Sequence, residues 1–492
     1  MNTTRGLLRG TRRSWILLPA GLLSLLGYLL YSQLYLRTGF PLDDAWIHQT
    51  YARNLALLGE WSFIPGQPSA GSTSPLWTLL LAPGHLLGLG PFVWTFFLGW
   101  ACLCGLAAAS LPLVRRLAPG RAHLALWAGL LLVFDWRVVW AAASGMETLL
   151  YALVIVSFFA LLLQERVRWL LLGLLVGLAV WIRPDGLTLS GPALMVLLSG
   201  EPDCQRRLRG GLAFLAGALA FFLPYLLFNQ ALAGEWWPNT FFAKQAEYAE
   251  LRQIPLLERY AQQLVQPLVG AGALLLPGFV LSLRSGIRRR DWAALAGAIW
   301  TLGYLFVYAW RLPVTYQHGR YILPAVPVYL IWGMAGLLEW VRIDEPQMVR
   351  RVLSRAWVLG LALLLAVFWV QGAQTCARDV AVIETEMVDT ARWVRENVPE
   401  GALVAAHDIG ALGYFAGRPL LDLAGLISPE VIPVIRDEAG LAAFLDRHQA
   451  QYLVTFPGWY PQLTQQAELV FSTDGAFSPA LGGENMAVYR WR

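Results

Sequence analysis

Apolar segments that could cross a lipid bilayer recur along most of the chain. A transmembrane helix needs roughly 20 apolar residues to cross about 30 Å of hydrocarbon. Only 14% of the residues are charged, against about 25% in a typical soluble domain. We therefore expect a polytopic α-helical membrane protein. The apolar segments lie near residues 14–36, 92–114, 122–138, 147–164, 169–183, 187–199, 211–229, 264–284, 292–310, 321–341 and 356–372.

The distribution of basic residues predicts how these segments are oriented. Lys and Arg are enriched in the short cytoplasmic loops of membrane proteins. The ambiguous segment 75–90 is short and contains Pro and Gly, whereas Ser74 and Pro75 are typical of a helix start. If 75–90 is an interfacial helix on the outer side, 20 basic residues lie inside and nine outside; if it spans, the bias largely reverses. The inner set begins with Arg5, Arg9, Arg12 and Arg13.

This argument predicts about 11 transmembrane helices, with the N-terminus inside and the C-terminus outside. The first span reads as an uncleaved signal anchor. Residues 37–91 form the first outer loop, which contains the interfacial helices. The transmembrane module extends from 1 to 372.

Residues 373–492 differ in character and predict a small α/β domain on the outer face. A helical pattern covers 384–397 and a second covers about 437–449. Short strand-like runs lie around them, namely ALVAAHD, QYLVTF, AELVFS and MAVYRW. Such an alternation of strands and helices is typical of an α/β domain.

Two adjacent carboxylates, Asp43 and Asp44, follow the first span directly. The segment after them predicts a helix that Gly59 ends. One carboxylate is well placed to cap that helix; the alternative is a general base, or a metal ligand, for a hydroxyl acceptor. Asp44 and His48 are four residues apart on one helical face, which permits a metal pair but supplies only two ligands.

Cations at the outer ends of the spans are candidates to bind a lipid phosphate. They are Lys244, Arg320, Arg183 and Arg137. Arginine matches the fork of a phosphate and lysine supplies a compact charge. Interfacial snorkelling explains Arg137 equally well, but it explains Arg320, which follows a polar run, less well. Lys244 is the only lysine of the chain. His318 and Asn239 join this donor-binding set. Candidates for acceptor or accessory contacts are His48, Arg53, Asp185, His407 and Asp408.

Other polar residues are assigned structural roles or none. Glu147 is expected to start a helix, and Asp135 to pair with Arg137. The four cysteines imply neither a disulfide framework nor a metal site. The basic residues form no dense stripe, so nucleic acid is not an expected partner.

Several motifs resemble the bacterial GT-C superfamily of membrane glycosyltransferases. They are LDDAWIHQTYARNL, STSPLW, RPDG, PNTFFAK, GRYILPAVP and, in the outer domain, HDIGALGYFAGRPLLDLAGLISPE. The nearest branch includes mycobacterial terminal arabinofuranosyltransferases. Aminoarabinose transferases and protein O-mannosyltransferases are more distant. The resemblance implies a polyprenyl-phosphate sugar donor and a location in the cytoplasmic (inner) membrane.

The resemblance also implies roles for particular residues. One acid of the first outer loop is the base, with Asp43 preferred, and Lys244 and Arg320 hold the lipid phosphate. Relatives often carry Glu where this chain has Asp44, and their metal use varies, so a divalent metal stays open. We expect an inverting transferase that glycosylates a glycan, lipid or protein at the outer membrane face. A non-enzymatic lipid-linked sugar flippase or transporter, or a cell-envelope assembly protein, is the alternative.

Overall fold

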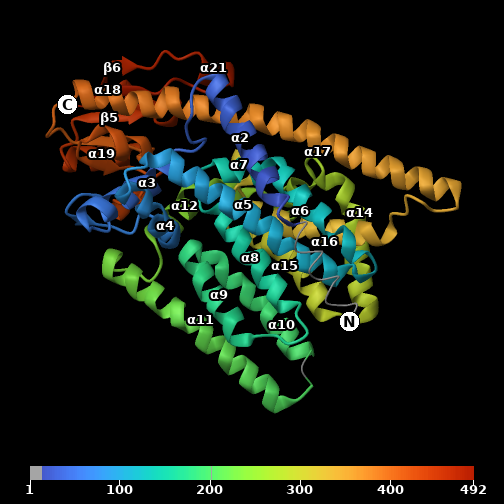
Figure 1. Cartoon of the computed structure of the whole chain (residues 1–492). Helices are drawn as coiled ribbons and strands as arrows, with labels where there is room; N and C mark the ends of the chain where they lie inside the picture. The colour runs from blue at the N-terminus through green and yellow to red at the C-terminus, as the bar shows by residue number, and fades with distance from the viewer. Residues whose placement is uncertain (1–13, 201, 492) are drawn as a thin grey trace.

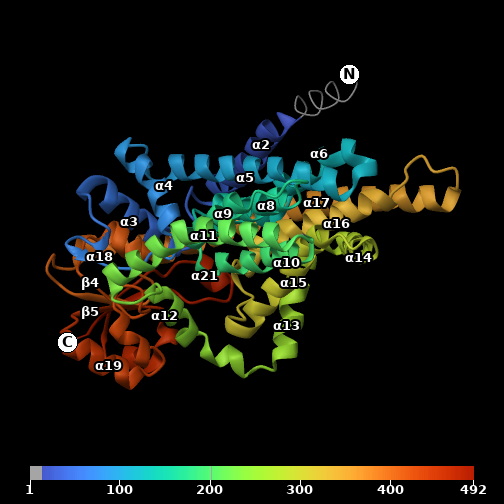
Figure 2. The ribbon, with the colours of Figure 1, turned by 90° about the horizontal axis from the view of Figure 1, so that it is seen from below.

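A bundle of helices with a small sheet at one end forms the protein (Figure 1). The computed structural model describes residues 14–200 and 202–491. The four arginines at the start of the orientation argument (Arg5, Arg9, Arg12 and Arg13) lie outside these residues. In Figures 1 and 2 the strands and α19 gather at one end of the bundle, and the described start of α2 faces the other.

The bundle is built from α2 (Leu17–Tyr35), α3 (Asp44–Leu58), α4 (Pro75–Leu86), α5 (Gly90–Leu117), α6 (Ala125–Phe134), α7 (Trp136–Ala143), α8 (Thr148–Leu162), α9 (Trp169–Ile182), α10 (Ser190–Gly200), α11 (Cys204–Ala233), α12 (Asn239–Glu247), α13 (Leu256–Val265), α14 (Gly272–Arg289), α15 (Trp292–Arg311), α16 (Val326–Trp340) and α17 (Met348–Val382). Each of the eleven apolar segments coincides with helix. The expected helical membrane architecture is therefore present.

The number of spans is less regular than the eleven expected. Among the described residues, six helices are long and apolar enough to cross a membrane, or eight if two bent pairs are each one span. One bend, of 55°, separates α6 from α7 at Asp135, whose side chain caps α7. The other, of 107°, precedes α14 near Gly270, which has a φ of +85°. The count of eleven and the orientation remain predictions.

Backbones approach closely where helices of the bundle cross. A Cβ on Gly173 of α9 would lie 2.0 Å from the carbonyl oxygen of Phe214 in α11. A Cβ on Gly336 of α16 would lie 1.9 Å from the carbonyl oxygen of Gly278 in α14. Small residues at such crossings are typical of helices packed in membranes, where dispersion between close backbones stabilises the contact.

The segment between α2 and α5 contains the helices that the sequence predicts. α3 ends at Leu58, and Gly59 takes the left-handed φ of +72° that terminates it. A short hairpin of β1 (Ser62–Ile64) and β2 (Gln67–Pro68) follows. α4 begins at Pro75 and packs its Trp77 and Leu81 against α3.

The C-terminal sheet has five strands in the order β4-β3-β5-β7-β6. β3 pairs in parallel with β4 and β5, and β7 pairs antiparallel with β5 and β6. Four of the five match the predicted runs; β4 was not predicted. Their bounds are β3 (Val404–Ala406), β4 (Leu420–Asp422), β5 (Tyr452–Thr455), β6 (Glu468–Ser472) and β7 (Ala487–Arg490).

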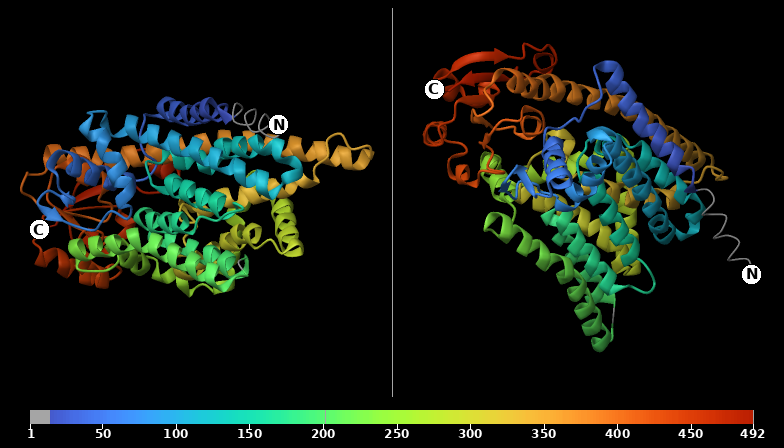
Figure 3. Two further views of the ribbon diagram at one scale, coloured as in Figure 1. Left: turned by 60° about the horizontal axis from the view of Figure 1, so that its bottom comes forward. Right: turned by 60° about the vertical axis from the view of Figure 1, so that its left-hand side comes forward.

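Helices cover both faces of this sheet (Figure 3). α19 (Glu438–Arg447) packs Leu441 and Phe444 on the face that carries Leu453. α18 (Asp389–Asn397) contributes to the core on the other face, and its Trp393 stacks on Phe471 at 4.6 Å. Alternate strand residues therefore enter two separate cores, as a pleated sheet requires.

One helical rod joins the bundle to the sheet domain. α17 continues through the π-helical turn η7 (Ile383–Val388) into α18 without a break in helix. The predicted boundary at 372 falls within α17, so the division into 1–372 and 373–492 stays a proposal. Arg37, which follows α2, pairs with Glu384 of η7 at 2.7 Å and so connects this rod to the segment between α2 and α5.

Candidate active site

Asp43 precedes α3, but its side chain does not cap that helix. Its two oxygens accept backbone N–H groups of Gly410, at 2.7 Å, and Ala411, at 2.8 Å, in the segment after β3. The cap interpretation of Asp43 is therefore wrong, and Asp43 instead joins the segment between α2 and α5 to the C-terminal domain. Burial and the charge of Asp408 raise the pKa of Asp43 to about 8, although the two N–H bonds favour the ionised form.

Asp44 has a different environment, between two cations. Its Oδ2 lies 2.8 Å from Nη1 of Arg320 and 3.5 Å from Nζ of Lys244 on α12. Both cations also donate to the hydroxyl of Tyr321, each at 3.0 Å. Burial alone raises the pKa of Asp44, but the charges of Arg320 and Lys244 outweigh burial and hold it below its ordinary value. Asp44 is therefore an ion-pair partner and a weak base.

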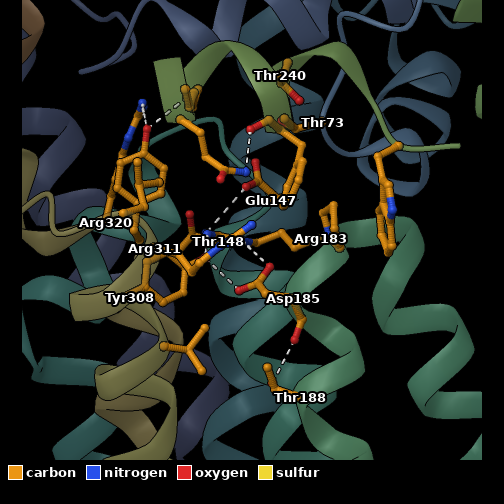
Figure 4. Close-up of a pocket in the computed structure, with 18 of the residues that line it drawn as sticks. Thr73, Glu147, Thr148, Arg183, Asp185, Thr188, Thr240, Tyr308, Arg311 and Arg320 are labelled. Atoms are coloured by element: carbon orange, nitrogen blue, oxygen red, sulfur yellow. Dashed lines mark hydrogen bonds and ion pairs between the residues drawn. The ribbon is translucent and has the colours of Figure 1, made fainter. Parts of the chain in front are cut away.

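Arg183 belongs to a second, adjoining network (Figure 4). Its Nη1 lies 3.9 Å from Glu147, and its Nε 3.3 Å from Asp185. Glu147 also lies 3.5 Å from Nε2 of His48. Glu147 precedes α8, as expected, but its side chain does not cap that helix. It is instead a buried carboxylate between His48 and Arg183.

A mostly apolar cavity of about 410 Å³ contains both networks at its wall. Its polar lining includes Asp44, Lys244, Arg320, Arg183 and Glu147. Figure 4 shows Arg320, Glu147, Arg183 and Asp185 around this space. Its apolar lining comes from several elements and includes Met146, Leu187, Trp237, Phe241, Val307, Trp310 and Leu312. We call it the apolar cavity.

A more polar cavity of about 560 Å³ lies between the bundle and the C-terminal domain. Asp44, Lys244 and Arg320 line it as well as the apolar cavity, so the two spaces meet at these three side chains. We call it the polar cavity. Its further lining includes Asp43, Glu247, Tyr248, Tyr316, Arg436, His407, Asp408, Trp459 and Tyr460. A smaller cavity of about 290 Å³ reaches Asp43, Asp44 and Asp408 past Trp140 and His318.

His407 and Asp408 follow β3, where the carboxyl ends of parallel strands open toward the bundle. His407 lies 3.6 Å from Glu247 and 2.7 Å from the hydroxyl of Tyr460. Burial lowers the pKa of His407, but the bond to Glu247 and the charge of Asp408 raise it overall. Oδ2 of Asp408 is buried with no hydrogen-bond partner among the described residues, and burial raises the pKa of Asp408 to about 6.

His318 lies behind Arg320 rather than in the apolar cavity. Its Nε2 is 2.7 Å from Oδ2 of Asp379 on α17, and Trp140 donates to the same oxygen at 3.0 Å. Gln317 and His318 have φ values of +51° and +61°, which are uncommon for residues with a Cβ. The turn before Arg320 is therefore strained and held by Asp379.

Four of the predicted residues line none of these three cavities, namely His48, Arg53, Asn239 and Arg137. Asn239 donates to the carbonyl oxygen of Leu426 at 3.3 Å, and Arg53 to that of Tyr414 at 2.7 Å. Both contacts tie the bundle to the C-terminal domain. The guanidinium of Arg137 donates to the backbone carbonyl of Gln266, whereas its backbone N–H donates to Asp135 at 3.2 Å.

The metal pair predicted from Asp44 and His48 lacks further ligands. Nδ1 of His48 lies 3.2 Å from the hydroxyl of Ser72, and its Nε2 faces Glu147. Within residues 14–200 and 202–491, no group of three or more His, Cys, Asp or Glu side chains is arranged to hold a metal ion.

The sequence did not single out Tyr321, Glu247 or Asp379. Tyr321 stands in the apolar run after Arg320, and Asp379 in a polar stretch after the last span. The sequence around each of these two residues is the same as that expected for a helix with a purely structural role. Glu247, three residues after Lys244, is the one with a usable signal: an acid on the same helix face as the only lysine.

Comparisons with known proteins show which folds this chain resembles. Residues 378–489 match the family described as "Domain of unknown function (DUF8728)". No curated protein matches the chain. ArnT from Cupriavidus metallidurans, in a crystal structure with undecaprenyl phosphate bound, is 16% identical with a TM-score of 0.59, over 96% of this chain and 97% of that one.

An oligosaccharyltransferase of Archaeoglobus fulgidus is also similar. Its apo structure is 12% identical with a TM-score of 0.57, over 89% of this chain and 69% of that one. AglB from the same organism, in complex with an inhibitory peptide and a dolichol-phosphate, gives 12% identity and a TM-score of 0.56 over the same shares. With its apolar helices, the chain is a multi-pass membrane protein, and it has the GT-C fold that its motifs predict.

Proposed function

We propose that the protein is an inverting glycosyltransferase that transfers a monosaccharide from a polyprenyl-phosphate donor to a hydroxyl acceptor. One observation carries this proposal. The Asp44–Lys244–Arg320 cluster stands where an apolar cavity meets a polar one. A lipid-linked sugar needs an apolar space for its chain and cations for its phosphate, and an acceptor needs a separate polar approach to the same point.

The apolar cavity is suited to the donor. Trp310 on its wall is 54% exposed and Phe241 36% exposed, as expected for a wall that opens toward lipid. Lys244 and Arg320 lie at the end shared with the polar cavity, where they would bind the phosphate. ArnT, which has the same fold, binds undecaprenyl phosphate, and this supports a similar donor.

Asp43 is proposed as the general base. It lines the polar cavity and has the raised pKa that a base working near neutral pH needs. In the proposed step the acceptor hydroxyl gives its proton to Asp43, and its oxygen bonds to the anomeric carbon from the face opposite the phosphate. The bond between that carbon and the phosphate oxygen breaks, and the polyprenyl phosphate leaves with the electron pair beside Lys244 and Arg320.

The polar cavity is the proposed path for the acceptor. Trp459 and Tyr460 of the C-terminal domain offer aromatic faces on its wall, and His407 with Glu247 offers hydrogen-bonding groups. A glycan, a lipid headgroup or a protein side chain would reach Asp43 there. We propose that this side lies at the outer face of the cytoplasmic membrane, and the distribution of arginines supports this orientation.

Transfer of labelled sugar from polyprenyl phosphate by the purified protein tests the assignment. We expect Asp43→Asn to lose about 10²- to 10⁴-fold in rate, the usual contribution of a general base. Asp422→Asn is the matched control, because Asp422 is also a buried carboxylate that accepts backbone N–H groups but lines none of the cavities described above. It should retain transfer.

Three outcomes would contradict the proposal. Full activity in Asp43→Asn would show that Asp43 is not the base. An equal loss in Asp422→Asn would show that the loss of any buried, hydrogen-bonded carboxylate impairs the protein, so the loss in Asp43→Asn would not report on proton transfer. If no donor supports transfer but the protein moves lipid-linked sugar across vesicles, the flippase alternative is correct.

A further inference from the structure

A hollow of about 530 Å³ lies among helix ends that Figure 1 shows at the end of the bundle away from the C-terminal sheet. It is formed by the end of α5, the last turns of α14 and α16, and the beginnings of α15 and α17. Five arginines line it, namely Arg116, Arg284, Arg288, Arg289 and Arg350. Only two carboxylates, Asp291 and Glu339, share the lining. The hollow therefore carries an excess of positive charge.

The ion pairs inside the hollow leave much of this charge uncompensated. Arg116 binds Asp291 at 2.9 Å, and Arg289 lies 3.9 Å from Glu339. Among the described residues, Arg284 and Arg288 have no hydrogen bond or ion pair. They are four residues apart on α14, so their like charges repel across one helical turn. A bound anion would relieve this repulsion.

Arg350 adds a second sign of an absent partner. It pairs with Glu345 at 3.5 Å and donates to the carbonyl oxygen of Trp340 at 3.4 Å, yet its Nε is buried without a partner among the described residues. A guanidinium presents its donors in a fixed fork that matches the oxygens of a phosphate. Arg350 comes from a different helix than Arg284 and Arg288, so the hollow offers convergent donors.

Apolar side chains beside the hollow indicate what carries the anion. Met348 and Val349 next to Arg350 are 70% and 72% exposed, and Ile287 next to Arg288 is 59% exposed. A free inorganic ion would not contact these exposed apolar side chains favourably. A phospholipid does, because its phosphate would enter the hollow while its acyl chains cover the apolar side chains.

We propose that this hollow binds the phosphate headgroup of an anionic membrane phospholipid, independently of the glycosyl-transfer site. The arginines also satisfy the topological preference for positive charge inside, which explains their side of the membrane. That preference does not require five arginines from three helices to surround one hollow. A lipid held there would connect α5, α14 and α17 at the end of the bundle opposite the proposed transfer site.

Native mass spectrometry of the full-length chain in non-ionic detergent tests this site. Phosphatidylglycerol and phosphatidylcholine with the same acyl chains are added in parallel. We expect one phosphatidylglycerol to bind at concentrations at which phosphatidylcholine does not. Arg284→Gln/Arg288→Gln should weaken its binding on the order of 25-fold, since each arginine near an anionic headgroup contributes about fivefold. Arg284→Lys/Arg288→Lys should keep most of the binding and guards against a folding defect.

The matched control is Arg206→Gln/Arg209→Gln, which removes two exposed charges from the first turns of α11 on the same predicted side. Its binding should stay within about twofold of the unchanged chain. Equal losses in both glutamine pairs, or no loss in either, would overturn the site. So would equal binding of the two lipids. Complete displacement of the lipid by millimolar inorganic phosphate would also overturn the lipid assignment.

Discussion

At the scale of single residues, Asp43 and Asp44 show how neighbouring acids acquire different chemistry. Asp43 is buried against backbone N–H groups and near Asp408, so it has a high proton affinity. Asp44 is paired with Arg320 and Lys244, so it stays ionised. Two titratable groups whose environments separate their pKa values commonly divide the roles of an active site. In the proposed reaction, Asp43 therefore accepts the proton and Asp44 positions the two cations.

Replacement of Asp408 should shift the pH dependence of transfer. Asp43 must be deprotonated to act as a base, so the rate should rise with pH as Asp43 loses its proton, near its pKa of about 8. The negative charge of Asp408 raises that pKa. In Asp408→Asn the pKa of Asp43 falls, and the rising limb of kcat/KM should move to lower pH. The measurement is a pH–rate profile.

Glu250→Gln is the control for this shift. Glu250 also lines the polar cavity, but it pairs with Arg436 at 2.7 Å and is not among the groups that act on Asp43. Its profile should match that of the unchanged protein. If the rising limb of the pH–rate profile does not move in Asp408→Asn, the assignment of Asp43 as the general base is contradicted.

At the scale of elements, the turn η5 (Gln317–Gly319) stands out because three successive residues have positive φ. Left-handed conformations cost residues with a Cβ about 1–2 kcal/mol each. The bond from His318 to Asp379, and the packing of the His318 ring on Trp140 at 4.9 Å, offset this cost. Since Arg320 follows directly, the turn decides where its guanidinium lies.

Loss of this bond should therefore weaken catalysis without removing a group that contacts substrate. Asp379→Ala should lower kcat/KM about 10- to 100-fold, because small misplacements of a binding group cost rate on that scale. Its effect should be much smaller when Arg320 is already replaced by Ala, in a double-mutant cycle. Glu384→Ala also breaks an ion pair of the same helical rod, with Arg37, away from the cavities. An equal loss of kcat/KM in Glu384→Ala would argue against positioning.

The elements also show how much the sequence could predict. The end of α3 at Gly59, the start of α4 at Pro75 and four of five strands follow from local patterns that the structure keeps. β4 is missed because its sequence, LLD, has no β-branched or aromatic residue and no alternation of apolar and polar residues. The bend at Asp135 is missed because the residues around it are apolar and were read as one continuous segment, although the Asp135 side chain caps a new helix there.

The sequence predicted which residues belong to the candidate site better than it predicted which of them are in contact. Asp44, Lys244 and Arg320 were all named from the sequence and do meet. Local spacing could not show that Asp43 binds a segment 367 residues away, or that Arg53 and Asn239 serve the same interface. These contacts depend on tertiary packing, and polar residues at the ends of spans look alike whether they bind a ligand or another loop.

At the scale of the whole molecule, the C-terminal domain forms part of the site rather than an appendage. Gly410 lies so close to Asp43 that a Cβ there would be 2.1 Å from the carbonyl oxygen of Asp43 and 2.6 Å from its Oδ2. Gly413 lies equally close to Phe63, where a Cβ would be 2.1 Å from the ring. Substitution of either glycine by alanine would therefore disturb the interface between the bundle and the C-terminal domain, at Asp43 in one case and at Phe63 in the other.

Gly410→Ala should impair transfer more than Gly413→Ala does. Both substitutions overpack the interface and should cost roughly 1–3 kcal/mol of stability. Only Gly410→Ala displaces the carboxylate proposed as the base. Thermal unfolding measures the shared cost and initial rates measure the difference. Equal rates at equal stability would show that the position of Asp43 is unimportant.

The pairing of Asp44 with Lys244 and Arg320 has a consequence for turnover. Without donor, these cations already have an internal counter-ion, so the binding of a lipid phosphate must compete with it. The leaving polyprenyl phosphate carries more negative charge than the donor did and would bind a bare pair of cations tightly. Asp44, returning to the same two side chains, competes with that product as well. In the proposed reaction it therefore limits inhibition by product and readies the protein for the next cycle.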